Sequence, residues 1–405
     1  MSTVERTVRA VPPARGGLLE RVAVRLLTGA LAGLDQGTLV ARLPDGTERT
    51  FGSGPAQTME ISDTSRLIRR LATRGTVGLG ESYQAGEWTS PDVVGLLELL
   101  YRNAEAAVAR HPRLARVMKA RPRPNRRQGL LHARRNIEYH YDLGNDLFRL
   151  MLDETMTYSC AVFERENEPL AEAQRRKLRR VCDKLELGPD DHLLEIGCGW
   201  GSFALTAAGE YGARVTGLTL SPAQAELARE RIRQAGLDDR IRILEEDYRV
   251  HRGSYTKLAS IEMIEAIGEK QFPVFFDACD RLLASGGRGC VQTILIPDHR
   301  WDRYRRSPDW IERYVFPGCL IPSHAALERA AEAASRVRVT GAEEIGPHYA
   351  ETLRRWRATF LARLDDVRRL GYDEHFVRTW DFYLAACEAG FRTGALRDAQ
   401  LVLER

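Results

Sequence analysis

The stretch Glu195-Ile-Gly-Cys-Gly-Trp-Gly201 carries the strongest fold signal in this chain. Residues 192–194 before it form a short apolar run typical of a strand, and residues 202–208 after it are typical of a helix. A glycine-rich turn between a strand and a helix opens a nucleotide-binding α/β unit. Glycine permits positive φ and lets a ligand approach the backbone closely. The stretch therefore predicts a ligand site at the end of a buried strand.

The spacing of the glycines narrows the type of ligand. It is G-x-G-x-G with an acid two residues earlier, and differs from the dinucleotide pattern G-x-G-x-x-G. This form resembles the first motif of class I S-adenosylmethionine-dependent methyltransferases. An ordinary tight turn remains the alternative, because many turns are rich in glycine. The residues expected to bind the cofactor are Glu195, Gly197, Gly199 and Gly201.

Strands and helices alternate on both sides of this motif. A helix is expected over 169–187, and Ser221-Pro222 is a favourable start for the helix after the second strand. Further strands are expected at 214–220, 241–244, 258–263 and 289–295, with helices at 223–235 and 274–283. This alternation predicts the α/β class, a mostly parallel sheet with helices on both faces. The last hundred residues are predicted to be mainly helical.

The first part of the chain is expected to form a separate small α+β domain. A helix is predicted over 18–34, a hairpin around Pro44-Asp-Gly46, a helix over 65–74, a loop over 75–86 and a helix over 92–103. The predicted boundaries are a disordered tail at 1–17, this domain at 18–108, a basic linker at 109–135 and the methyltransferase domain at 136–405. Two domains suit a chain of 405 residues.

Composition limits the class of protein. Hydrophobic residues make up 43% and charged residues 29%, which is typical of a globular protein. No apolar run approaches the roughly 18–20 residues of a membrane span, and the N-terminus lacks a signal peptide. The seven cysteines show no CxxC spacing, so free thiols in a reducing cytoplasm are expected, without a metal site.

A basic segment runs from Arg110 to Arg135 without a single acidic residue. It could be a solvated linker. Nucleic acid would also attract it, but no aromatic residues are interleaved to stack on bases. An anionic membrane surface attracts such a segment by roughly 1 kcal/mol per Lys or Arg. Contact with the inner face of the cell membrane, without a nucleic-acid partner, is the favoured interpretation.

Several segments together resemble the cyclopropane-fatty-acyl-phospholipid synthases and their mycolic-acid relatives. Besides the glycine motif they are Glu138-Tyr-His-Tyr-Asp-Leu-Gly-Asn145, Met156-Thr-Tyr-Ser-Cys-Ala161, Gly217-Leu-Thr-Leu-Ser221, Asp247-Tyr-Arg249, Glu265-Ala-Ile-Gly268 and Tyr314-Val-Phe-Pro317. Gly78 to Tyr83 and Gly86 to Trp88 are similar to the extra domain of the longer bacterial members. The resemblance implies a homodimer that alkylates a cis double bond of phospholipid acyl chains with the methyl group of S-adenosylmethionine.

The resemblance also implies the cofactor site. Tyr141 and the glycine turn would hold the methionine part of S-adenosylmethionine. The ribose contacts would come from Thr219, Ser221 and Gln224, and the adenine contacts from Asp247 and Tyr248. Many class I enzymes place an acid after the second strand, whereas this chain and the family it resembles have neutral polar groups there.

The reaction needs a base in a dry pocket. Attack of an alkene on the sulfonium methyl leaves a carbocation that water would quench, and one proton must then be removed. The family uses a bound bicarbonate as this base. The residues that match its binding site are Cys160, Glu265, Gln292, Ile294 and Tyr349. Gln292 replaces the family's histidine, and Ala266 replaces the histidine that usually follows the glutamate.

Gln292 affects the expected product. Glutamine donates a hydrogen bond but never becomes a cation, so an anionic base is held less strongly. Slower deprotonation allows a 1,2-hydride shift, and loss of a methyl proton then gives a 10-methylene chain, which a separate reductase would convert to a methyl branch. Ring closure to a cyclopropane is the alternative. A non-catalytic lipid- or cofactor-binding protein and a small-molecule methyltransferase are the rival classes.

Overall fold

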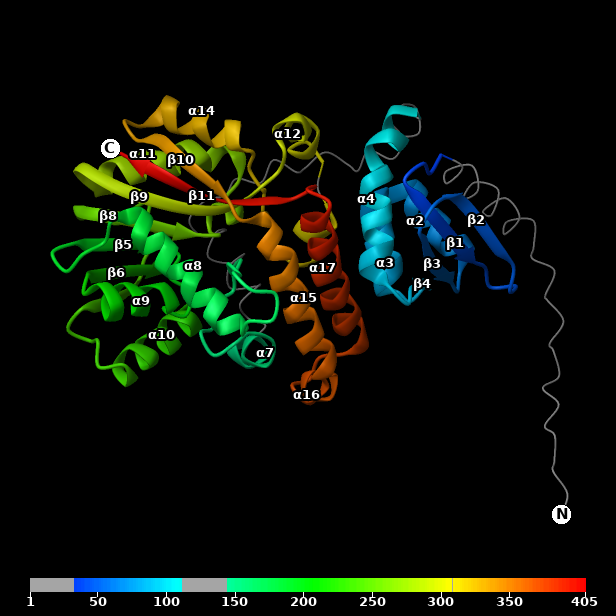
Figure 1. Ribbon diagram of the computed structural model, residues 1–405, viewed down its shortest axis with the longest axis horizontal. Coiled ribbons are helices and arrows are strands. Elements are labelled where there is room, and N and C mark those ends of the chain that lie inside the picture. The colour runs from blue at the N-terminus through cyan, green and yellow to red at the C-terminus, as the bar shows by residue number, and fades with distance from the viewer. Residues whose placement is uncertain (1–32, 111–143, 308) are drawn as a thin grey trace, which may run out of the picture. The chain divides into compact units, whose positions relative to one another are not determined.

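The computed structural model describes residues 33–110, 144–307 and 309–405 (Figure 1). The chain divides into two compact units, Met1–Met118 and Lys119–Arg405. The predicted tail, the helix expected over 18–34, the basic segment after Arg110 and the predicted cofactor ligand Tyr141 lie outside the described residues.

The first unit contains a four-stranded sheet in the order β2-β1-β3-β4. The predicted hairpin is confirmed, because β1 and β2 pair antiparallel and the Leu43 amide donates to the Thr47 carbonyl at 2.9 Å. Strand β3, which pairs parallel to β1, was not predicted from the sequence. The elements are β1 (Gly37–Arg42), β2 (Glu48–Ser53), β3 (Ala56–Ile61), α2 (Thr64–Arg74), α3 (Thr76–Gln84), β4 (Trp88–Thr89) and α4 (Val93–Arg110).

The loop predicted over 75–86 is wrong, since most of it is helix α3. Glycines suggested a loop there, but Gly78 is needed for helix packing. A Cβ at Gly78 would lie 2.3 Å from the Arg70 carbonyl oxygen of α2. Only glycine lets α2 and α3 approach this closely, so the residue that lowers helix propensity also permits the tertiary contact.

The second unit is built on a seven-stranded sheet in the order β10-β11-β9-β8-β5-β6-β7 (Figure 1). Neighbouring strands from β9 to β7 pair parallel, which confirms the predicted α/β class. The parallel strands are β5 (His192–Ile196), β6 (Arg214–Thr219), β7 (Ile241–Glu245), β8 (Tyr255–Ile261) and β9 (Leu283–Leu295). Strand β5 lies between β6 and β8, so the chain reverses its strand order beside β5, where ligands bind in such sheets.

Helices cover both faces of this sheet (Figure 1). One hydrophobic cluster contains Val181 and Phe203 from the side of α8, α9 and α10. The other contains Phe275 and Phe276 from the side of α11 and α14. The helices are α8 (Leu170–Leu185), α9 (Ser202–Tyr211), α10 (Pro222–Gln234), α11 (Phe272–Leu282) and α14 (His324–Ala334).

The C-terminal part is mainly helical, as predicted, but it also supplies two strands that the sequence analysis missed. Strands β10 (Arg338–Glu344) and β11 (Arg397–Glu404) add antiparallel to β9. Strand β11 lies between β10 and β9, and its residues 398–403 are all buried and show no alternation. The remaining elements are α7 (Gly144–Met151), the 3₁₀ turns η1 (Ile264–Ala266) and η2 (Glu269–Gln271), α12 (Asp298–Tyr304), α13 (Trp310–Tyr314), α15 (Gly346–Ala362), α16 (Leu364–Arg369) and α17 (Glu374–Arg392).

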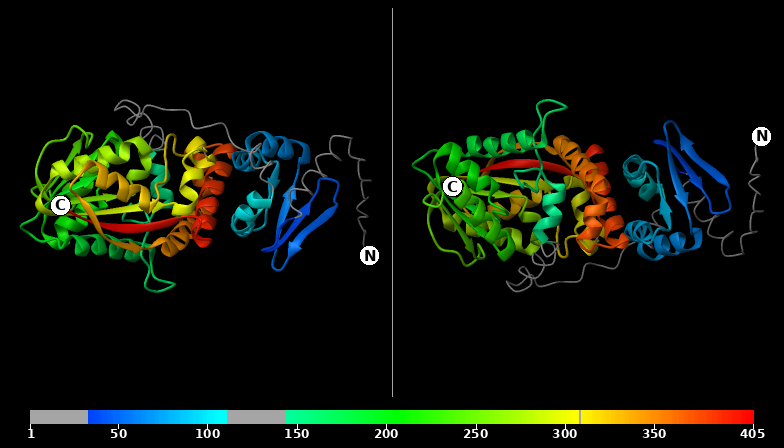
Figure 2. Two further views of the ribbon diagram at one scale, coloured as in Figure 1. Left: turned by 90° about the horizontal axis from the view of Figure 1, so that it is seen from above. Right: turned by 90° about the horizontal axis from the view of Figure 1, so that it is seen from below.

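Helices α15 and α17 form a pair beside the sheet. The orange α15 and the red α17 lie side by side in every view (Figures 1 and 2). Tyr349 on α15 stacks on Phe391 of α17 with ring centroids 4.5 Å apart. This pair carries Tyr349 towards the carboxyl ends of β8 and β9, where the functional groups gather.

Candidate active site

The glycine turn forms one wall of a pocket at the carboxyl end of β5. Gly197, Gly199 and Gly201 all have positive φ, at 85°, 52° and 81°. A Cβ at Gly197 would lie 2.9 Å from Cγ of Met263, whereas a Cβ at Gly199 would meet no atom within 4 Å. Because Gly199 lines the pocket, a side chain there would enter the space that a ligand needs.

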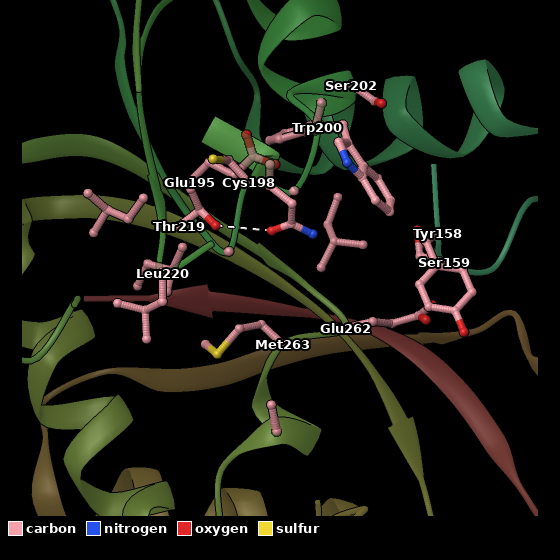
Figure 3. Close-up of a pocket in the computed structure, with 18 of the residues that line it drawn as sticks. Tyr158, Ser159, Glu195, Cys198, Trp200, Ser202, Thr219, Leu220, Glu262 and Met263 are labelled. Atoms are coloured by element: carbon pink, nitrogen blue, oxygen red, sulfur yellow. Dashed lines mark hydrogen bonds between the residues drawn. The ribbon is translucent and has the colours of Figure 1, made fainter. Parts of the chain in front are cut away.

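Glu195 is a buried carboxyl at the end of β5 that lines the same pocket (Figure 3). Burial raises the pKa of Glu195 to about 8, although the charge of Lys177 opposes this shift. Its Oε2 atom is buried and has no hydrogen-bond partner among the described residues. A buried acceptor without a partner is costly, so this atom fits a cationic ligand. S-adenosylmethionine carries both a sulfonium and an ammonium group.

Neutral polar groups stand at the end of the neighbouring strand β6. The Thr219 hydroxyl donates to Oε1 of Gln224 at 3.0 Å (Figure 3) and accepts from the Ser221 amide at 3.1 Å. Ser221 caps α10 by accepting from the Gln224 amide at 3.3 Å. The structure thus brings together the three predicted ribose ligands, and Thr219 and Gln224 line the pocket.

The predicted adenine ligands follow β7 and also line the pocket. Asp247 accepts hydrogen bonds from the Arg249 guanidinium at 2.9 and 2.6 Å, so its carboxylate is already paired. Tyr248 is buried and meets Phe275 edge-on at 5.7 Å. The pocket therefore has a cationic-ligand end, a hydroxyl-rich edge and an aromatic edge in the order that S-adenosylmethionine requires.

The expected base site contains a residue that the sequence analysis missed. The carboxylate of Glu262 accepts from the Cys160 amide at 2.8 Å, from Nε2 of Gln292 at 2.8 Å and from the Tyr349 hydroxyl at 2.6 Å. These are three of the groups predicted to hold bicarbonate. Burial and then the charge of Glu262 raise the pKa of Tyr349 well above its usual value, so its hydroxyl keeps the proton that it donates.

A chain of hydrogen bonds fixes the orientation of the Gln292 amide. Its Oε1 atom accepts from Nε2 of Gln400 at 3.0 Å, and Oε1 of Gln400 accepts from Lys184 at 2.8 Å. Lys184 in turn pairs with Glu343. Because lysine only donates, each amide in the chain has one allowed orientation, and the NH₂ group of Gln292 must face Glu262.

The other two predicted residues lie beside this cluster. Glu265 accepts from the Ile294 amide and from the Thr293 hydroxyl, the latter at 2.8 Å. Burial, with a smaller contribution from the charge of Glu262, raises the pKa of Glu265 to about 8. Asp398 of β11 approaches Gln292 at 3.4 Å. Burial and the charge of Glu262 raise the pKa of Asp398 well above its usual range.

The structure thus separates the predicted bicarbonate ligands into two groups. Cys160, Gln292 and Tyr349 converge on Glu262, whereas Ile294 and Glu265 bond to each other. Glu262 gave one signal in the sequence, a charged residue directly after an apolar strand of the parallel sheet, where ligands bind. Asp398 gave none, because its strand was not predicted.

Comparisons with known proteins identify the family. A family model described as mycolic acid cyclopropane synthetase matches residues 129–401. The chain is 42% identical over 369 residues to the tuberculostearic acid methyltransferase UfaA1 of Mycobacterium tuberculosis, covering 89% of this chain and 86% of that protein. It is 32% identical over 359 residues to the cyclopropane-fatty-acyl-phospholipid synthase of Escherichia coli (strain K12), covering 87% and 89%.

A solved structure of a family member has the same fold. The crystal structure of the mycolic acid cyclopropane synthase CmaA1 complexed with SAH and CTAB matches with a TM-score of 0.62 and 31% identity, over 67% of this chain and 98% of that chain. The pocket and the cluster around Glu262 thus belong to a fold that this chain shares with these enzymes. The chain belongs to the cyclopropane-fatty-acyl-phospholipid synthase family and is an S-adenosylmethionine-dependent fatty-acyl methyltransferase.

Proposed function

We propose that the protein methylates the cis double bond of a phospholipid acyl chain and releases a 10-methylene chain. The observation that carries this proposal is the neutral amide of Gln292 beside the base site, where the ring-forming enzymes that this chain resembles have histidine. The 42% identity to a methyltransferase named for tuberculostearic acid, a methyl-branched acid, supports the same product class.

The residues of the chain explain how the pocket serves this reaction. S-adenosylmethionine supplies the methyl group. Glu195, the glycine turn and the polar groups of Thr219 and Gln224 would hold it at the carboxyl edge of the sheet. Aromatic rings shield the cluster around Glu262: Tyr349 lies between Phe391, at 4.5 Å, and Trp356, at 6.1 Å. A dry apolar wall protects a carbocation from water.

The timing of proton loss decides the product. In both outcomes the base removes a proton from the transferred methyl group. Immediate removal closes the ring, whereas removal after a 1,2-hydride shift leaves an exocyclic double bond. A neutral donor such as Gln292 stabilises an anionic base less than a histidine imidazolium would. Proton removal is therefore slower than in the ring-forming enzymes, which leaves time for the hydride shift.

The test is the structure of the product. The purified protein is incubated with methyl-¹³C-labelled S-adenosylmethionine and vesicles of oleoyl phospholipid, and the fatty acids are examined by NMR. We expect labelled vinylic signals from a methylene group at C10. Upfield cyclopropane signals alone would overturn the product and keep the methyltransferase assignment. Label only in a water-soluble acceptor would favour a small-molecule substrate, and no transfer would favour a binding protein.

We also propose reversible, electrostatic contact with an anionic membrane through the basic residues of 110–135. None of the described helices is long and apolar enough to cross a membrane. Binding to vesicles should require anionic lipid and weaken as salt shortens the Debye length, about 10 Å at 0.1 M. Equal binding to neutral vesicles would contradict this contact. The homodimer, the cytoplasmic location and the separate reductase stay predictions.

A further inference from the structure

The carboxylate of Glu262 accepts hydrogen bonds from three of the groups that were expected to hold bicarbonate. Its Oε1 atom accepts from the Cys160 amide and from Gln292, both at 2.8 Å, and its Oε2 atom accepts from Tyr349 at 2.6 Å. A carboxylate and a bicarbonate present the same planar pair of oxygens, so these donors can serve one of them at a time. The residues present therefore do not fit bicarbonate, because the chain supplies its own anion.

The backbone of Glu262 is held in an unusual conformation. Its φ is +49°, in the left-handed region that non-glycine residues rarely adopt. The Glu262 amide donates to the Gln292 carbonyl at 2.8 Å, which holds the turn between β8 and η1 in place. Backbone strain of this kind is concentrated at functional sites. Here it aims the carboxylate at the three donors.

Glu262 also lines the S-adenosylmethionine pocket, together with Glu195 and Thr219 (Figure 3). Asp398, Glu265 and the buried ammonium of Lys177 influence it electrostatically. Lys177 donates to the Ser159 hydroxyl at 2.6 Å and is fully buried. The three donors fix the Glu262 carboxylate at the wall of the pocket that would hold the methyl donor, and a general base must lie within reach of the proton that it removes.

We propose that Glu262 is the catalytic base and replaces bicarbonate in this protein. The proposal rests on the methyl transfer described above. The C–S bond breaks with its electrons going to sulfur, the alkene electrons form the new C–C bond, and the neighbouring carbon becomes the cation. A 1,2-hydride shift moves the cation to the carbon that bears the new methyl group, and a C–H bond of that methyl group then breaks. Its electrons form the exocyclic C=C bond of the product, its proton passes to the Glu262 carboxylate, and the resulting acid releases the proton to water.

Substitutions at Glu262 separate a built-in base from a bound one. We expect wild-type protein to keep its full activity in buffer freed of carbon dioxide. Glu262→Gly should lose roughly 10²- to 10⁴-fold in turnover, the usual contribution of a general base, and should recover in part when bicarbonate is added. Glu262→Gln should stay inactive with bicarbonate, because its amide still fills the donor site but accepts no proton.

A matched control is available in Glu186, another glutamate with positive φ, at +51°. It caps the exposed end of α8 and pairs with Arg288, outside the pocket. Glu186→Gly relieves the same type of backbone conformation without touching the site, so its activity should equal that of wild type. Calorimetric binding of S-adenosylmethionine to Glu262→Gly, unchanged from wild type, shows that this variant is folded.

A second readout does not depend on turnover. We expect ¹³C-bicarbonate to show protein-dependent NMR line broadening with Glu262→Gly and none with wild type or Glu262→Gln. Wild-type activity that falls without carbon dioxide and returns with bicarbonate would overturn the proposal, as would full activity of Glu262→Gln. A cyclopropane product that forms without bicarbonate would leave Glu262 as the base and refute only the methylene product. If no substrate is methylated, the proposed function fails, and the bicarbonate spectra still decide whether Glu262 takes the place of bicarbonate at the three donors.

Discussion

The two ends of the pocket are built in different ways. At the cofactor end, Glu195, Thr219 and Asp247 lie at or just after the ends of three neighbouring parallel strands, within one stretch of alternating strands and helices. At the base end, Cys160, Glu262, Gln292 and Tyr349 come from four separate segments, and three of them touch the fourth. The first end is assembled by local motifs and the second by tertiary contacts alone.

The two ends also use their carboxyl groups differently. Glu195 has a buried oxygen without a partner among the described residues, whereas both oxygens of Glu262 accept hydrogen bonds. Lys177 acts electrostatically on both carboxyl groups. A carboxyl group with an unused acceptor is suited to binding a ligand, whereas a carboxyl group whose two oxygens both accept hydrogen bonds is suited to a fixed, reactive position. Substitutions at each end should therefore affect different measurements.

The largest effect is expected at the glycine turn. Gly199→Val places a branched side chain in the pocket at a residue with φ of 52°. We expect calorimetric affinity for S-adenosylmethionine to fall by roughly 100-fold or more, at about 1.4 kcal/mol per tenfold. Gly286→Val is the control, because Gly286 also has positive φ, at 72°, in an exposed position outside the pocket. Equal affinity of the two variants would contradict the assignment of the turn.

The next effect concerns the base end. Tyr349→Phe removes the donor 2.6 Å from Glu262 and keeps the ring stacked on Phe391. A hydrogen bond to a charged group contributes about 1.5–3 kcal/mol, so turnover should fall roughly 10- to 100-fold with unchanged cofactor affinity. Tyr211→Phe, which removes a similar bond to Asp183 on the surface, should be neutral. A weaker cofactor affinity in Tyr349→Phe would show that the two ends are not separable.

A pH dependence should distinguish the cofactor end. Because burial raises the pKa of Glu195 to about 8, this carboxyl is protonated in the free protein below that pH. A cationic ligand binds the ionised form and displaces the proton. Affinity for S-adenosylmethionine should therefore rise about tenfold between pH 6 and pH 7, with uptake of the proton by the buffer. Glu195→Gln should abolish this dependence, and a slope that persists in this variant would assign it to another group.

The smallest effect is expected for Cys160. Its amide donates to Glu262, whereas its thiol is buried and burial raises the pKa of that thiol well above its usual value. Cys160→Ala keeps the amide, so turnover should stay within about threefold of wild type, a change below ~0.7 kcal/mol. A loss as large as that of Tyr349→Phe would mean that the thiol itself takes part in the reaction.

Local signals in the sequence predict most of the fold of the second unit and the turn at the cofactor end. The α/β alternation, the turn from Glu195 to Gly201 and the helix cap at Ser221 follow from periodicity, glycine and capping chemistry over short distances. Local signals did not predict α3, where Gly78 permits a close contact with Arg70, or β11, whose residues 398–403 are all buried and show no alternation. In both places a tertiary contact overrode the local signal.

The group that fills the base site became visible only from contacts between distant segments. The resemblance brought Cys160, Gln292 and Tyr349 together as ligands of a free anion, but no spacing rule connects them to Glu262. Their meeting depends on β8 lying beside β9 and on α15 carrying Tyr349 to the same edge. The role of the Glu262 carboxylate is seen only from the donors around it, and those donors are distant from it in the sequence. Local patterns therefore place the residues expected at the cofactor end along one pocket, whereas the occupant of the base site depends on contacts that no local pattern contains.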